Sequence, residues 1–142
     1  MTVAPMPITA STPIKIQFYD CDPMAIVWHG NYPKYFEQAR CALLDRIDFN
    51  YRQMSQTEFI WPIVDMRIKY VRSLVFGQVI EATATLVEFE NRLRIDYALR
   101  DAATKEIVTK GQTIQMAVHR ATGETAFESP APLLEAVRRA LS

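Results

Sequence analysis

Hydrophobic and polar residues alternate near the start of the chain. Ile14, Ile16 and Phe18 are separated by single polar residues, and this period of two is typical of a strand with one buried face. Pro23 cannot donate a hydrogen bond to a sheet and restricts its own φ. We therefore expect a strand that ends where the chain reaches Asp22.

After Gly30-Asn31 the period changes to that of a helix. Apolar residues recur at intervals of three and four, with charged or polar residues between them, at Tyr32, Phe36, Ala39, Leu43 and Ile47. The pattern predicts an amphipathic helix of about four to five turns. Asn31 suits the N-cap position and Pro33 suits the first turn. His29 is therefore expected at or just before the start of this helix.

The second half of the chain has the pattern of strands. They are expected at residues 59–71, 79–88, 92–99 and 107–119. Gly77 and Asn91 mark turns between them, and Pro62 indicates an edge strand or a bulge in the first. Residues 48–56, between the long helix and these strands, read as a short connection or a brief extra turn.

The chain closes with a second helical pattern. Ser129-Pro130 precedes a short helix with apolar positions at Leu133, Leu134, Val137 and Leu141. One strand, one long helix, four strands and a closing helix predict an α+β fold, in which a five-stranded antiparallel sheet wraps around the long central helix. We expect one domain over residues 1–142, of which residues 1–12 form a loose N-terminal arm.

Composition excludes several function classes. Lys plus Arg and Asp plus Glu both number 16, so the net charge of zero gives no reason to expect a nucleic acid or an anionic membrane as partner. The N-terminus lacks the pattern of a signal peptide, and no apolar run approaches the ~18 residues of a membrane helix, so we expect a cytoplasmic protein. Cys21 and Cys41 have no metal-site spacing, and we expect neither a metal nor a disulfide.

The candidate chemistry lies where the first strand gives way to the long helix. A helix N-terminus presents unpaired backbone N–H groups that can hold a developing oxyanion. Asp22 lies seven residues before His29 and can reach the same reacting carbonyl. Asp22 is therefore a candidate nucleophile or general base, with the amides around His29 on the electrophilic side. The common hydrolase, nucleotide and zinc-protease motifs are absent from the sequence, which leaves this site without a rival.

The same junction resembles a known family. Residues 16–23, Ile-Gln-Phe-Tyr-Asp-Cys-Asp-Pro, with Ile26-Val27-Trp28-His29 and Asn31-Tyr32, closely resemble the signature of hotdog-fold acyl-CoA thioesterases of the 4-hydroxybenzoyl-CoA thioesterase-like family. Over the rest of the chain the match to this family is weaker, but its elements follow in the same order. The resemblance implies a single hotdog domain that hydrolyses an acyl-CoA to a free acid and a thiol. It also implies that no cofactor is needed, since CoA is part of the substrate.

The resemblance assigns roles to individual residues. It implies that Asp22 is the catalytic carboxylate, that His29 occupies a second catalytic position, and that the backbone amide there polarises the thioester carbonyl. Trp28 and Tyr32, within the same signature, are expected to contact the substrate. Members of the family join their sheets edge to edge, so we expect a homo-oligomer, either a dimer or a tetramer.

The chain departs from the family pattern in two places. Residues 76–78 read Phe-Gly-Gln, where the family usually has acidic residues. The basic residues that bind CoA phosphates are matched only in part, by Arg92 and Arg94. These two alternate across a strand, which favours solvated or cross-strand-paired side chains over two phosphate ligands. This weaker basic cluster leaves a thioester carried on acyl carrier protein as an alternative substrate.

The sequence leaves open the role of Glu37 and the type of activity. Glu37, about two turns into the helix, either lines the acyl pocket as a substrate contact or is a solvated charge. The chain is either a hydrolase or a non-hydrolytic subunit that binds acyl thioesters. A dehydratase or hydratase on the same fold would carry its catalytic residues in a different motif.

Overall fold

A computed structural model describes residues 7–142. Five strands form one antiparallel sheet in the order β1-β4-β5-β6-β3, and two short strands, β2 and β7, pair separately. The strands are β1 (Thr9–Lys15), β2 (Phe59–Ile60), β3 (Ile63–Tyr70), β4 (Val79–Glu88), β5 (Leu93–Asp101), β6 (Ile107–Gln115) and β7 (Val118–His119). The helices are α1 (Tyr32–Arg46), α2 (Tyr51–Met54) and α3 (Ala131–Leu141), with 3₁₀ turns at Phe18–Asp20 and His29–Asn31.

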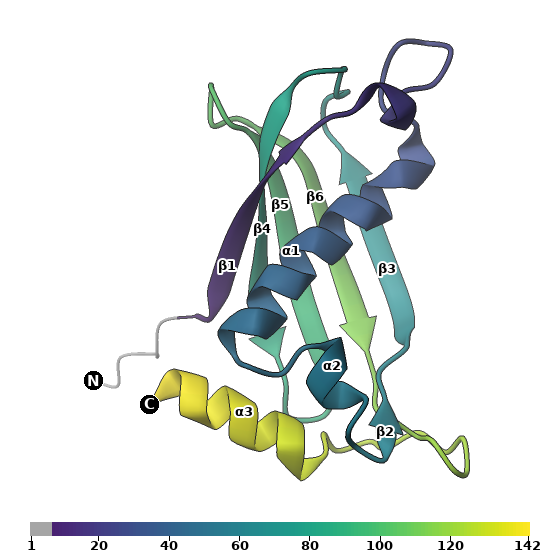
Figure 1. Cartoon of the computed structure of the whole chain (residues 1–142), viewed down its shortest axis with the longest axis vertical. Coiled ribbons are helices and arrows are strands. Elements are labelled where there is room, and N and C mark those ends of the chain that lie inside the picture. The colour runs from purple at the N-terminus through teal and green to yellow at the C-terminus, as the bar shows by residue number, and fades with distance from the viewer. Residues whose placement is uncertain (1–6) are drawn as a thin grey trace.

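The long helix α1 crosses one face of the sheet diagonally (Figure 1). It packs mainly against β1 and β4, where its apolar stripe is buried. Phe36 has no exposed surface, and its ring stacks on Tyr97 of β5 with the ring centroids 4.6 Å apart. Gly111 of β6 makes room for this ring, since a Cβ at that position would lie 2.3 Å from it. This close contact fixes the height of α1 above the sheet.

The two edges of the sheet are β1 and β3. Register places Met66, Ile68 and Tyr70 of β3 on the same face as Tyr97, because they share β6 partners with the buried residues of β5. The last of these, Tyr70, reaches the start of α1, where its ring meets that of Tyr32 edge to face at 4.8 Å. The end of β3 and the start of α1 are thereby brought together.

The predicted architecture is confirmed. A central helix, a five-stranded antiparallel sheet and a short C-terminal helix are all present, and α3 lies across the end of the molecule away from the start of α1 (Figure 1). The strand expected at residues 79–88 has the bounds Val79–Glu88. The connection at residues 48–56 contains the single-turn helix α2.

The first strand was predicted with the wrong bounds. Residues 9–12, expected in a loose arm, pair with β4 as part of β1, and residues 1–6 lie outside the described part of the chain. The strand also ends at Lys15, before the apolar alternation ends. The reason is that Phe18 is 76% exposed and packs edge to face on Phe76 rather than in the core. Pro13 is tolerated inside β1 because this is an edge strand.

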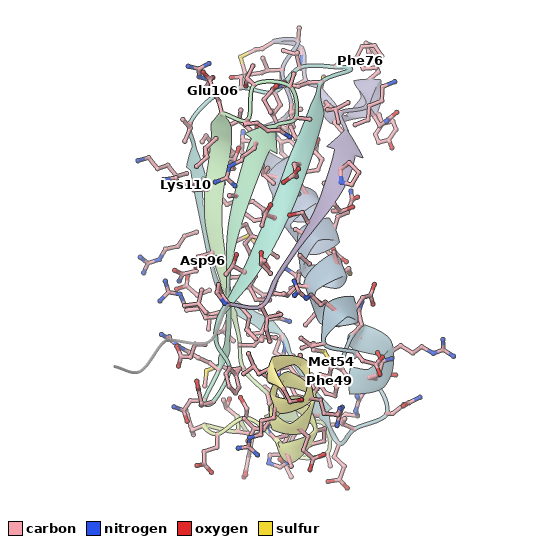
Figure 2. The ribbon with its side chains drawn as sticks, turned by 90° about the vertical axis from the view of Figure 1, so that its left-hand side faces the viewer. Phe49, Met54, Phe76, Asp96, Glu106 and Lys110 are labelled. Atoms are coloured by element: carbon pink, nitrogen blue, oxygen red, sulfur yellow. The ribbon has the colours of Figure 1, made fainter. Side chains whose placement is uncertain are left out.

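Two other predicted strands are interrupted. Residues 59–71 divide into β2 and β3 around Trp61-Pro62, with a register shift after Ile63, as the proline indicated. Residues 107–119 divide into β6 and β7, because the sheet ladder ends at Gln115 and the chain then turns to pair with β2. Figure 2, turned by 90° from Figure 1, shows side chains projecting from both the sheet and the helix layer.

Candidate active site

Residues 16–31 link β1 to α1 through a closed loop. The chain makes the 3₁₀ turn Phe18–Asp20, loops through residues 22–26, and enters α1 through the 3₁₀ turn His29–Asn31. Cys21 and Val27 form an antiparallel bridge at the base of this loop, and the N–H of Val27 donates to the carbonyl of Leu74 at 2.9 Å. The loop that carries Asp22 is therefore tied to itself and to the segment after β3.

Asp20 is a structural anchor of this region. Its side chain is buried, and Oδ2 accepts a hydrogen bond from the N–H of Gln17 at 2.9 Å. Its carbonyl accepts from the N–H of Trp28 at 3.0 Å and from Nδ2 of Asn31 at 2.8 Å. Asn31 precedes α1 as predicted, but its side chain does not cap the helix. It binds the Asp20 carbonyl instead and so fastens the start of α1 to the aspartate motif.

Asp22 begins the loop of residues 22–26, and one of its two carboxylate oxygens is hydrogen-bonded within that loop. Its N–H donates to the carbonyl of Ile26 at 2.8 Å, and its carbonyl accepts from the N–H of Ala25 at 2.9 Å. Ala25 adopts a left-handed φ of 65°, a strained conformation for a residue with a Cβ. Oδ1 of Asp22 accepts from the N–H of Met24 at 2.8 Å, while Oδ2 has no hydrogen-bond donor among the described residues. The second oxygen is thus available to a substrate or a water.

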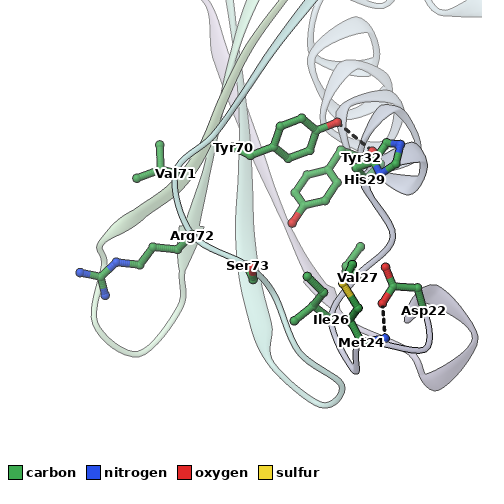
Figure 3. Close-up of a pocket in the computed structure, with 10 residues that line it drawn as sticks. All are labelled: Asp22, Met24, Ile26, Val27, His29, Tyr32, Tyr70, Val71, Arg72 and Ser73. Atoms are coloured by element: carbon green, nitrogen blue, oxygen red, sulfur yellow. Dashed lines mark hydrogen bonds between the residues drawn. The ribbon is translucent and has the colours of Figure 1, made fainter.

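A pocket of about 230 Å³ lies between this loop, the start of α1 and the segment that follows β3 (Figure 3). Asp22, His29 and Tyr32 all line it, so the structure brings together three of the residues that the sequence predicted for the site. Its full lining is Asp22, Met24, Ile26, Val27, His29, Tyr32, Tyr70, Val71, Arg72 and Ser73.

Two tyrosines form the wall of the pocket at the start of α1. The hydroxyl of Tyr70 donates to the carbonyl of His29 at 2.8 Å (Figure 3). Burial raises the pKa of Tyr32, a backbone contact with Leu74 lowers it in part, and the nearby Tyr70 raises it further. The hydroxyl of Tyr32 therefore stays protonated at neutral pH and presents a neutral polar group to the pocket.

The N-terminal end of the helix faces the loop that carries Asp22. The 3₁₀ turn His29–Asn31 leads directly into α1, and the first N–H groups of a helix have no partner within it. In Figure 3 the helix rises away from His29 while Asp22 lies on the loop below. The site therefore offers a free carboxylate oxygen on one side and amide donors with the positive end of a helix dipole on the other.

Comparison with known proteins places this geometry in a family. The family model described as the thioesterase-like superfamily matches residues 16–141. The chain belongs to the thioesterase-like superfamily. One relative is the protein YneP of Bacillus subtilis (strain 168), a candidate acyl-CoA thioesterase, which is 34% identical over 65 residues. That match spans about half of each protein, 46% of this chain and 47% of the relative.

Solved structures show that this superfamily member has the hotdog fold. A DHNA-CoA thioesterase from Staphylococcus aureus superposes with a TM-score of 0.83 at 22% identity, over 92% of this chain and 89% of that one. An aspartate-to-asparagine variant of 4-hydroxybenzoyl-CoA thioesterase, bound to 4-hydroxybenzoyl-CoA, gives a TM-score of 0.75 at 18% identity, over 91% and 98%. Both similarities establish the fold.

Other residues that the sequence proposed as substrate contacts lie outside this pocket. The Trp28 ring covers Gly30 and lies beside the His29 ring, with the centroids 5.3 Å apart. Glu37 faces a separate hollow on the outer side of α1. Within one chain, these two residues do not line the space in front of Asp22.

Arg92 and Arg94 belong to the end of the sheet away from the pocket. Arg92 pairs with Glu88 at 2.9 Å, and Arg94 approaches Asp96 at 3.5 Å. Arg92 is thus paired within the turn between β4 and β5, and the acidic neighbour of Arg94 lies two residues along the same strand. Their role in binding CoA phosphates stays a prediction.

The sequence analysis missed the contribution of the β3 end. Tyr70, Arg72 and Ser73 line the pocket although they lie about 50 residues beyond Asp22. Arg72 is a cation at the pocket wall, and its Nη1 lies 2.7 Å from Oε2 of Glu106. No local spacing marks these residues. Only the pairing of β3 as an edge strand beside the start of α1 brings them to the site.

Three negative observations apply to residues 7–142. No group of three or more His, Cys, Asp or Glu side chains is arranged to hold a metal ion. No helix there has both the length and the apolar character to cross a membrane. Cys21 and Cys41 are not joined by a disulfide. The expected cytoplasmic location stays a prediction.

Proposed function

We propose that the protein hydrolyses acyl-CoA thioesters, with Asp22 as the reactive carboxylate and the N-terminal amides of α1 as the oxyanion site. The observation that carries this proposal is the shared pocket, in which Asp22 faces the helix start at His29. Membership of the thioesterase-like superfamily supports the same chemistry. No cofactor is required, because a thioester carbonyl is already activated and its thiolate leaves readily.

The mechanism begins with the thioester carbonyl between Asp22 and the start of α1. Asp22 either deprotonates a water that adds to the carbonyl carbon or adds to that carbon itself. Both routes put a negative charge on the carbonyl oxygen, and the amide donors of the helix start stabilise it. The C–S bond then breaks and the thiolate takes a proton. The route through Asp22 as nucleophile ends with a water that hydrolyses the acyl-enzyme anhydride.

His29 contributes in two ways under this proposal. Its backbone N–H lies at the start of the helix, and in this mechanism it donates to the developing oxyanion. Its imidazole is exposed at the pocket wall, where it orients the attacking water or gives a proton to the leaving thiolate.

The proposal is tested by turnover of a panel of acyl-CoA thioesters. Aromatic, short, medium and long acyl groups are each offered to the purified protein, and the released thiol is measured. We expect steady turnover of at least one class. Saturable binding of acyl-CoA without thiol release would instead identify a non-hydrolytic acyl-thioester binder, and hydration of an enoyl thioester would identify a hydratase.

Arg72 is the candidate to meet the anionic part of CoA, because it is the arginine that lines the pocket. Arg72→Gln should raise KM for an acyl-CoA several-fold and leave kcat nearly unchanged. The same acyl group on N-acetylcysteamine, which has no phosphate, serves as the matched control substrate. An equal rise in KM for both substrates would show that Arg72 does not act on the phosphates.

A thioester on acyl carrier protein is the second candidate substrate, and one surface favours it. Lys69 of β3 and Lys110 of β6 are directly opposite each other on the outer face of the sheet, with Arg67 two residues away. Like charges in register are unfavourable unless an anionic partner covers them. An acidic carrier protein would do so. Lys69→Glu should then raise KM for the acyl carrier protein substrate alone, more strongly at low salt.

We further propose that the protein forms a homodimer through the edge of β3. This edge exposes Ile63, Val64 and Val71 beside unpaired backbone groups, which is the template for pairing with a second strand. Sedimentation should give at least twice the chain mass, and Val64→Glu should shift the population toward monomer. A monomeric wild-type protein at assay concentrations would contradict the proposal.

A further inference from the structure

The carbonyl of His29 is bound by a side chain from another element. The hydroxyl of Tyr70, at the end of β3, donates to this oxygen at 2.8 Å. Tyr70 is 47% exposed, so its hydroxyl could bind water, yet it binds the His29 carbonyl. The aromatic contact with Tyr32 holds the ring in place beside α1. The bond therefore joins the edge strand to the first turn of the helix.

This carbonyl belongs to the same peptide group as the N–H of Gly30. A trans peptide is planar, and its C=O and N–H point in opposite directions. Holding the His29 carbonyl therefore also fixes the direction of the Gly30 N–H. A hydrogen bond donated to the carbonyl also polarises the peptide and makes its N–H a stronger donor.

The preceding peptide is held in the same way. The carbonyl of Trp28 accepts from the backbone N–H of Asn31 at 2.9 Å, which orients the N–H of His29. Asn31 is in turn bound to the carbonyl of Asp20. Two successive N–H groups at the helix start, those of His29 and Gly30, thus have fixed directions before any substrate arrives.

The absence of a side chain at residue 30 also matters. A Cβ on Gly30 would lie 2.5 Å from the ring of Trp28, which lies over this backbone. The Trp28 ring therefore lies against the Gly30 backbone, and only a residue without a side chain fits beneath it.

We propose that Tyr70 is a positioning residue that sets the N–H of Gly30 as a second donor to the oxyanion, beside the N–H of His29. The inference rests on the proposed thioester hydrolysis and names the two N–H groups that form its oxyanion site. The edge strand β3 thereby contributes to catalysis indirectly, through the peptide that Tyr70 holds.

Kinetics of Tyr70→Phe give the first test. The variant keeps the ring and removes one hydroxyl, so we expect kcat to fall about tenfold, as for the loss of one hydrogen bond, while KM stays within about twofold. Tyr19→Phe, which removes an 81% exposed hydroxyl outside the pocket, is the matched control and should keep wild-type kcat. The melting temperature of Tyr70→Phe should match that of the control.

Vibrational spectroscopy gives a readout that a merely structural role would not move. In the Asp22→Asn background, a bound acyl-CoA should show its thioester C=O stretch shifted to lower frequency, because the amide donors polarise the bond. Adding Tyr70→Phe should move the band back toward its value in water. Gly30→Ala, which displaces the Trp28 ring, should shift the C=O band in the same direction. This second variant provides the test if Tyr70→Phe does not fold.

The outcomes separate this inference from the function on which it rests. No turnover by the wild-type protein would defeat the proposed hydrolysis itself. Wild-type turnover that Tyr70→Phe leaves unchanged, or a loss that appears only in KM or melting temperature, would overturn the positioning role. An unmoved C=O band in both variants would overturn the second donor.

Discussion

At the scale of single residues, Arg40 is a buried cation held by hydroxyl groups. It is 5% exposed, yet no carboxylate of the described residues pairs with it. Nε donates to the hydroxyl of Tyr51 at 2.7 Å, and Nη1 donates to that of Tyr97 at 3.1 Å. Burial tends to lower the pKa of Arg40, but the two tyrosines outweigh it, so the pKa is raised and the charge is kept.

A buried charge without a counter-ion makes its hydroxyl partners important. Tyr97→Phe should destabilise the protein by about 1–3 kcal/mol, because Arg40 loses a buried acceptor. Arg40→Met removes the charge and keeps the volume, so in the Tyr97→Phe background it should restore stability. The measurement is the free energy of unfolding in urea of the wild-type protein, the two single variants and the double variant. A double variant less stable than Tyr97→Phe alone would show that the charge itself stabilises the core.

At the scale of elements, the contact between α1 and the sheet depends on Gly111. Gly111→Ala would place a methyl group 2.3 Å from the Phe36 ring and 3.1 Å from the carbonyl of Arg67. The ring cannot easily yield, because it is fully buried and stacked on Tyr97. We expect the free energy of unfolding of Gly111→Ala, measured in urea, to be about 1–3 kcal/mol lower than that of wild type. Adding Phe36→Leu should restore part of this stability, because a smaller side chain relieves the clash. If the losses of stability of the two single variants simply add in the double variant, this packing account is wrong.

The turn between β5 and β6 carries a pH-dependent contribution. Asp101 accepts hydrogen bonds from the backbone N–H groups of Thr104 and Ala103 and from the side chain of Gln78, and these lower its pKa. Gln78 thereby ties this turn to the segment before β4.

A carboxyl with a lowered pKa stabilises the fold when ionised. This contribution is fully present above the ordinary Asp pKa of about 3.9 and is lost as the pH falls through the lower folded value. Asp101→Asn should therefore melt at a lower temperature than wild type at pH 7. The difference between the two melting temperatures should become smaller as the pH falls below about 4. A difference that does not change with pH would rule out this source of stability.

At the scale of the whole molecule, the sequence predicted the order and type of the main elements. Long periodic stretches such as 32–47 and 79–88 carry their own signal, and both elements are present. The bounds of β1 were not predictable, because Phe18 continues an apolar alternation but contacts an exposed aromatic residue far along the chain. Local pattern does not distinguish a core contact from a surface one.

The candidate site was predictable only in the part that lies within one segment. Asp22 and His29 are close in sequence and share a motif, and the structure places both in the pocket. Tyr70 and Arg72 reach the same pocket through the sheet order, which no local pattern encodes. Trp28 is part of the motif but supports Gly30 instead of lining the pocket.

The most direct test of the whole account is the turnover number of Asp22→Asn. The amide keeps the size of the side chain and an oxygen for the bond from Met24, but it has no charge and no basicity. With an acyl-CoA that the wild-type protein hydrolyses, kcat should fall at least about a hundredfold while the melting temperature is kept. Asp48→Asn, at an exposed left-handed position that Asn also tolerates, should keep full activity as the control. Wild-type turnover by a folded Asp22→Asn protein would contradict the account.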